Sequence, residues 1–168
     1  SDERSRAIAA VLAVFWALAG GGFEIGQHAI FDVGAWGLGF ICLIQSGMLL
    51  WAGVIGRRLR FRLSGPDKCP AILLAIAAAA LPAAVVLVAG RRLAETQPFG
   101  LAPLPVALFT LALLLAAAPR AARRFLAVPV ILGTFYGATA LTFGVYEDAV
   151  LPALVLAAAA LLFRRRGA

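Results

Sequence analysis

The chain alternates between long apolar runs and short polar segments, and this pattern predicts six helices. Each run approaches the roughly 20 residues that an α-helix needs to cross a bilayer. We expect the first helix to fray at three consecutive glycines, 20–22, and Pro82 to kink the third. The predicted helices span about 7–23, 33–56, 70–90, 105–118, 125–145 and 149–163. The sequence therefore predicts an all-α integral membrane bundle of six transmembrane helices, with 1–168 as a single domain.

Composition supports lipid as the solvent of this bundle. The 168 residues are 63% hydrophobic and 14% charged, whereas a soluble domain is about 45–50% apolar and about 25% charged. A chain of this size cannot bury so much apolar surface in a core of its own. We therefore expect a multi-pass membrane protein.

The basic residues gather at the ends of the apolar runs, which fixes an orientation. The net charge is +7, but clustering at helix ends follows the positive-inside rule and argues against a nucleic-acid partner. With six crossings, thirteen of the 15 Lys and Arg residues fall on one side and only Arg91 and Arg92 on the other. Both termini are therefore predicted to be cytoplasmic. The thirteen are Arg4, Arg6, Arg57, Arg58, Arg60, Arg62, Lys68, Arg120, Arg123, Arg124, Arg164, Arg165 and Arg166.

Two predicted helices carry small residues at helical spacing. Helices in lipid associate by close packing of such residues. We therefore expect helices 33–56 and 125–145 to be central and to pack against each other, with helices 70–90 and 149–163 peripheral or packed on a partner. The packing residues are Ala35, Gly39, Cys42 and Ser46 in the first of these and Gly133, Gly137 and Gly144 in the second.

The best candidate for chemistry is the segment after the first helix, which contains Glu24, His28 and Asp32. At i, i+4 and i+8 they share one face if the segment is helical, and carboxylates with an imidazole are a plausible ligand set for a divalent metal. His28 is equally a candidate ligand for a pigment or haem iron, or a partner of Asp32. The alternative is that a loop outside the bilayer is simply polar.

The predicted spans contain no Asp, Glu, Lys, Arg or His. Transporters usually carry such residues at depth, so this pattern disfavours a coupled ion pump. The threonines in the spans are expected to bond back to their own helices, and Gln45 to bond across helices. No nucleophile–base pair has supporting context, so we expect no enzymatic activity, and the sequence identifies no cofactor.

Several short motifs resemble an uncharacterised bacterial membrane-protein family of unknown function. They are the segment 98–105, Val128-Pro129, Gly133, the segment 144–148, Ala35-Trp36-Gly37, Gln45, and Trp51 through the Arg60-Phe61-Arg62 cluster. The resemblance runs from Trp16 to the C-terminus and implies a short version of a longer family, located in the bacterial inner (cytoplasmic) membrane. Leu104 stands where the family usually has Cys, and Glu24 where it has His. No activity is assigned to the family, so none is implied.

These features favour a non-enzymatic accessory or scaffold subunit, packed in the lipid bilayer against other subunits of a larger membrane complex of respiratory or photosynthetic type. The alternative is a small transporter or channel for a cation or a small neutral solute, with the acidic residues of the outer face gathering the cation.

Overall fold

The structure is a computed structural model that describes residues 2–30, 32–61, 68–90, 92, 99–117 and 123–164. The described residues form helices and no strands; Phe61 and Ala117 make one isolated bridge. The prediction of an all-α fold with six helices is confirmed. They are α1 (Asp2–Ala17), α2 (Gly34–Leu49), α3 (Lys68–Val88), α4 (Pro103–Leu115), α6 (Ala127–Thr142) and α7 (Val150–Arg164).

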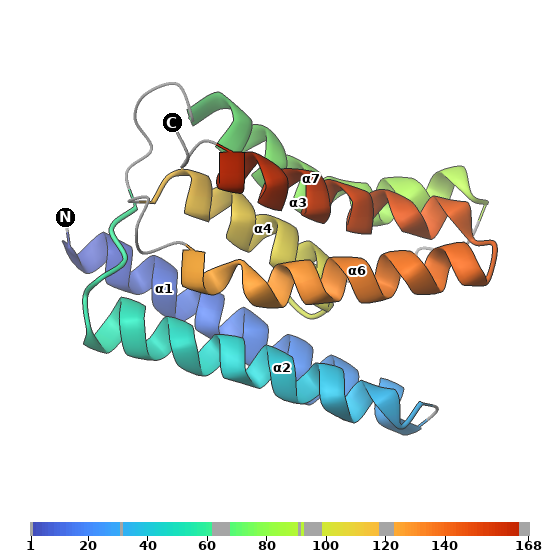
Figure 1. The fold of residues 1–168 in the computed structure, drawn as a ribbon, viewed down its shortest axis with the longest axis horizontal. Helices are drawn as coiled ribbons and strands as arrows, with labels where there is room; N and C mark the ends of the chain where they lie inside the picture. The colour runs from blue at the N-terminus through green and yellow to red at the C-terminus, as the bar shows by residue number, and fades with distance from the viewer. Residues whose placement is uncertain are drawn as a thin grey trace.

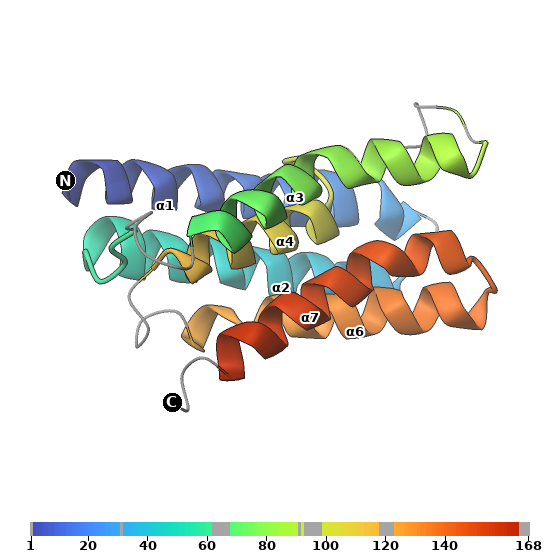
Figure 2. The ribbon, with the colours of Figure 1, turned by 90° about the horizontal axis from the view of Figure 1, so that it is seen from above.

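The six helices run alternately in opposite directions along one long axis, so the start of α1 and the end of α7 lie at the same end of the bundle (Figure 1). The helices α1 and α2 form one antiparallel pair and α6 and α7 another, while α3 packs against α4 (Figure 2). The helix α4 lies between these groups and contacts α1, α3, α6 and α7.

The centre of the bundle is α4, and the prediction that helices 33–56 and 125–145 are central and pack mainly against each other is wrong. Nearly every residue of α4 is buried, whereas α2 packs chiefly on α1 and α6 on α7. A helix that is apolar on all sides is suited both to a protein core and to lipid. The hydrophobic pattern of α4 therefore did not distinguish it from its neighbours.

The start of α4 is buried and is built with few hydrogen-bond donors. The first N–H groups of a helix have no partner within the helix. Pro103 and Pro105, which have no N–H, occupy two of these positions, and no side chain caps Ala102. This helix can therefore begin in apolar surroundings at little cost.

The first two helices both continue as π-helices after their α-helical part. The segment Leu18–Ile25 (η1) follows α1, and Leu50–Ile55 (η3) follows α2. The i to i−5 bonds that define this geometry include Gly26 N–H to Gly21 O at 3.1 Å and Gly56 N–H to Trp51 O at 2.7 Å. The expected fraying at 20–22 is therefore wrong, because the glycines lie inside a continuous helical segment.

The small residues of α2 face α1 and η1. Gly39 and Gly20 form a close crossing: a Cβ added to Gly39 would lie 2.9 Å from Gly20 O, and one added to Gly20 would lie 2.6 Å from Gly39 O. Ala35 and Cys42 are buried on the same face, and the Ser46 hydroxyl donates to Ala13 O at 2.7 Å.

The glycines of α6 divide into two roles. Gly133 and Gly137 face α7, where an added Cβ would lie 3.0 Å from Val155 and 3.3 Å from Pro152. Gly144 has no atom within 4 Å of an added Cβ and adopts φ +71° beyond the end of α6. At this position it ends the helix, in the left-handed conformation that glycine tolerates, and it does not lie against a neighbouring helix as Gly133 and Gly137 do.

Two predictions about polar side chains in the helices are confirmed. The Gln45 side chain donates to Phe125 O at 3.2 Å, across to the segment that enters α6. The hydroxyls of Thr110, Thr134, Thr139 and Thr142 donate to carbonyls four residues earlier.

Among the residues that the structure describes, four helical segments are long and apolar enough to cross a membrane: Asp2–Ile30, Gly34–Ile55, Lys68–Val88 and Tyr146–Arg164. The other two, α4 and α6, are apolar and shorter. The helix α3 continues through Pro82.

Candidate functional site

Glu24 lies inside the bundle, near the end opposite the N-terminus. The predicted first helix ends at about Phe23, and this boundary is wrong, because the helical segment Asp2–Ile30 continues through Glu24. The residue is 1% exposed. It is the one Asp, Glu, Lys, Arg or His that is buried among the side chains that the structure describes. The expectation that the spans contain no ionisable residue fails with it.

The π-helical turn turns Glu24 inward. An α-helix advances about 100° per residue, so in a straight α-helix Phe23 would lie within about 20° of the buried Trp16 and Glu24 about 80° away. The wider turn of η1 advances by less per residue. Glu24 is accordingly buried, and Phe23 only partly so. Irregular helical turns of this kind are frequent at functional sites.

The depth of the site follows from its neighbour on α2. The Ile25 side chain lies against Gly39, and Gly39 is five residues beyond the start of α2 at Gly34. At about 1.5 Å per residue this is roughly 7 Å inside that end of the helix. Glu24 is therefore below the surface of the bundle but close to it.

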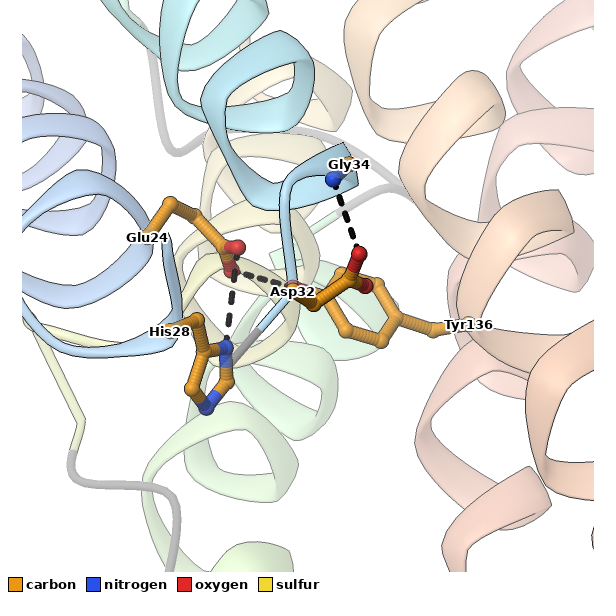
Figure 3. A network of polar contacts seen from close by, with 5 residues as sticks. All are labelled: Glu24, His28, Asp32, Gly34 and Tyr136. Carbon is orange, nitrogen blue, oxygen red and sulfur yellow. Dashed lines mark hydrogen bonds and ion pairs between the residues drawn. The ribbon is translucent and has the colours of Figure 1, made fainter. Parts of the chain in front are cut away.

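The Glu24 carboxyl has a different environment at each oxygen (Figure 3). Tyr136, from the middle of α6, donates its hydroxyl to Oε1. His28, one helical turn after Glu24, has Nδ1 3.6 Å from Oε2, slightly beyond hydrogen-bond range. Oε2 has no hydrogen-bond partner among the described residues. The site therefore has one anchored oxygen and one that faces the imidazole.

His28 connects this carboxyl to the surface. Its side chain is 46% exposed, and its ring packs edge-on against Phe23 with the ring centres 4.4 Å apart. Nδ1 points toward Glu24 and the other ring nitrogen points away from it (Figure 3). The imidazole thus bridges the buried carboxyl and the outside. A role for His28 as a pigment or haem ligand stays a prediction.

Asp32 does not join the carboxyl and the imidazole. Its Oδ1 accepts a hydrogen bond of 2.8 Å from Gly34 N–H, capping the start of α2. Within the described ranges, no group of three His, Cys, Asp or Glu side chains is placed to hold a metal ion. The structure therefore does not bring Glu24, His28 and Asp32 together as one set of metal ligands. The 3-10 turn between η1 and α2 directs Asp32 to the helix start instead.

Tyr136 is the residue that sequence reasoning missed. It is 112 positions from Glu24, so only the pairing of helices brings the two together. The available signal was chemical: a tyrosine within an apolar helix usually finds a hydrogen-bond partner for its hydroxyl. The buried carboxyl needs that partner as well, because an unpaired ionised group in an apolar interior costs several kcal/mol.

The site can carry out simple chemistry. A carboxyl and a phenol accept and donate hydrogen bonds, and the carboxyl also takes up or releases a proton. Cys42 of α2 lies within electrostatic reach of both groups. These features define a class: an apolar six-helix bundle with a carboxyl buried near one end.

The chain belongs to a family described as "Family of unknown function (DUF6064)", which matches residues 2–167. The resemblance to a family of unknown function, inferred from the sequence motifs, is thereby confirmed, and the match begins earlier than that resemblance, at residue 2. No curated protein and no solved structure matches the chain.

Proposed function

We propose that this chain is an integral membrane protein that binds and exchanges a small cation at Glu24, as a small transporter does. The observation that carries the proposal is the carboxyl itself, 1% exposed within an apolar helical segment. Burying an ionisable side chain there is expensive, and such residues mark ion pathways and relays. The sequence argument against an ion pump rested on the absence of any such residue from the predicted spans.

The distribution of charge supports a membrane orientation. Arg57, Arg58 and Arg60 follow η3, and Lys68 begins α3. Arg60 pairs with Asp2 at the start of α1, and α3 begins at that same end of the bundle (Figure 1), whereas the Glu24 site lies toward the opposite end. By the positive-inside rule the basic end faces the cytoplasm. We therefore place both termini in the cytoplasm of a bacterium, six crossings in its inner membrane, and the Glu24 site near the outer surface.

The native cysteines offer a direct test of this orientation. Cys69, beside Lys68 at the start of α3, is exposed, whereas Cys42 is buried. A membrane-impermeant maleimide should label inverted membrane vesicles but not intact spheroplasts, and Cys69→Ser should abolish the labelling. Labelling of intact spheroplasts at Cys69 would reverse the orientation and place the Glu24 site inside.

Transport is tested with the purified chain in liposomes. Uptake of protons, sodium and potassium is measured in turn, under an imposed gradient of each. We expect uptake of at least one ion, lost in Glu24→Gln and retained in Glu3→Gln, a matched substitution on an exposed side chain at the other end of the bundle. Equal uptake by empty liposomes, wild type and Glu24→Gln for every ion would refute the proposal.

A second candidate function is the accessory or scaffold subunit, and the exposed face of α3 favours it. Leu73, Ile76 and Leu87 are exposed at helical spacing, with the exposed Ala80 and Ala84 between them. A small-x-x-x-small pair flanked by large apolar residues suits close contact with another membrane helix. Co-purification of stoichiometric membrane subunits in mild detergent, lost in Ala80→Trp, would support this function; a chain that always migrates alone would exclude it.

A further inference from the structure

We propose that the cation exchanged at Glu24 is a proton, and that His28 carries it between Glu24 Oε2 and the aqueous phase. This inference rests on the proposed function and deepens it, because it names the ion and its route. It follows from the number of ligands at the site, the space around them, and the orientation of the imidazole.

The site offers too few ligands for a metal cation. Calcium takes about six to eight oxygens and magnesium about six, several of them water. Here Glu24 Oε1 already accepts the Tyr136 hydroxyl, and Asp32 is engaged with Gly34 N–H. Oε2 has no hydrogen-bond partner among the described residues, and one lone pair on it is enough to bind a proton, whereas a metal ion needs several ligands.

The packing around Glu24 also leaves little room for a hydrated ion. The Glu24 side chain is 1% exposed, and its Oε2 lies out of contact with solvent. A proton transferred through a side chain needs no space of its own. Burial therefore favours the smallest cation.

His28 is placed to transfer that proton. Its Nδ1 is 3.6 Å from Oε2, so a movement of a few tenths of an ångström makes a hydrogen bond. Its other ring nitrogen points away from the carboxyl, on a side chain that is half exposed (Figure 3). Water thus reaches one nitrogen and Glu24 faces the other.

The transfer balances in protons and charge. The neutral ring, with its proton on Nδ1, accepts a proton from hydronium at Nε2 and becomes an imidazolium. Nδ1 then gives its proton to Oε2, which leaves a neutral carboxylic acid and a neutral imidazole protonated at Nε2. The same steps in reverse release the proton and restore the first tautomer.

Four titratable side chains near Glu24 form the surroundings in which the proton is exchanged. Tyr136 faces it from α6, Cys42 from α2, and His28 and Asp32 from the segment that follows η1. Tyr136 holds Oε1 and so keeps Oε2 directed to His28. We treat Tyr136 as a positioning residue.

The experiment uses the full chain in liposomes and follows the carboxylic acid C=O band by infrared spectroscopy. A pH titration should reveal a band that appears with acidification and is missing in Glu24→Gln. If that variant fails to fold, Tyr136→Phe identifies the band instead, because loss of the hydrogen bond shifts its frequency without removing it. A titrating band that neither variant alters, or no titrating band at all, overturns the proton as the ligand.

The route is tested by the rate of the same band after a pH jump. Positioned acid–base groups contribute about 10²–10⁴-fold to proton transfer, so His28→Ala should slow the change by about 10²-fold, and added imidazole should restore much of it. Gln27→Ala, at an exposed neighbour, should leave the rate unchanged. An unchanged rate in His28→Ala overturns the role of His28.

The liposome uptake assay separates failure of this inference from failure of the proposed function. Sodium or potassium uptake that depends on Glu24, without a titrating carboxylic acid band from Glu24, overturns the proton and leaves cation transport standing. Absence of both overturns both.

Discussion

The crossing of Gly20 and Gly39 makes a sharp prediction about stability. Replacing Gly39 by Ala places a Cβ 2.5 Å from Ile25 Cγ1 and 2.9 Å from the carbonyl oxygen of Gly20. Unstrained carbon contacts lie at about 3.5–4.0 Å. Neither neighbour yields easily, because one atom is backbone and the other lies close to the Ile25 Cβ.

The magnitude follows from two opposing terms. Overpacking a tight contact costs about 1–3 kcal/mol, and Ala gains about 0.8–1.0 kcal/mol over Gly within a helix. Gly37, on the exposed face of the same helix, has no atom within 4 Å of an added Cβ. Gly37→Ala should therefore gain the helix propensity of Ala without a steric cost. We therefore expect Gly39→Ala to be about 1–3 kcal/mol less stable than Gly37→Ala, the steric cost alone.

The assay is equilibrium unfolding in mild detergent, titrated with SDS and followed by circular dichroism. A second matched pair tests the other side of the crossing. An added Cβ on Gly20 would lie 2.6 Å from Gly39 O, whereas Gly21 has nothing within 4 Å. Gly20→Ala should therefore be destabilised relative to Gly21→Ala by a similar amount. Equal stability within either pair would refute the close contact between η1 and α2.

Two further substitutions test the carboxyl site and the second helix pair by the same titration. Tyr136→Phe leaves both Glu24 oxygens without a hydrogen-bond donor in a buried site, so we expect a loss of about 1–3 kcal/mol. Tyr146→Phe, on a side chain that is 70% exposed, should stay within about 0.5 kcal/mol of wild type, and a similar loss in both would remove the special role of Tyr136. Gly137→Leu adds a branched side chain where a Cβ already lies 3.3 Å from Pro152, and should cost about 1–3 kcal/mol. A variant as stable as wild type would show that α6 and α7 do not pack closely there.

The number of helices and their local polar contacts were predictable because they depend on short stretches of sequence. Apolar runs near bilayer length, interrupted by charges and prolines, define six helices. The back-bonding of Thr134 and Thr139 follows from the absence of any alternative acceptor in an apolar helix. Gln45 had to bond across helices for the same reason.

The arrangement of the helices was not predictable, because lipid and protein interior select similar residues. The stripes of small residues identified close helix faces but not their partners: Gly39 meets Gly20, and Gly133 meets Val155. The burial of Glu24 was not predicted because three glycines normally indicate the end of a helix, whereas here they lie within a π-helical turn. Without that turn, neither the depth of the carboxyl nor its bond to Tyr136 could be anticipated.

The two prolines at the start of α4 affect how the chain crosses the bundle. A buried backbone donor without a partner costs about 1–3 kcal/mol, and replacing two such donors by proline rings avoids that penalty twice. The helix is consequently free to start part-way into the protein, and its 13 residues cover about 20 Å, against about 32 Å for the 21 residues of α3. Restoring an N–H with Pro105→Ala would be expected to draw water, or a compensating acceptor, into this otherwise dry position.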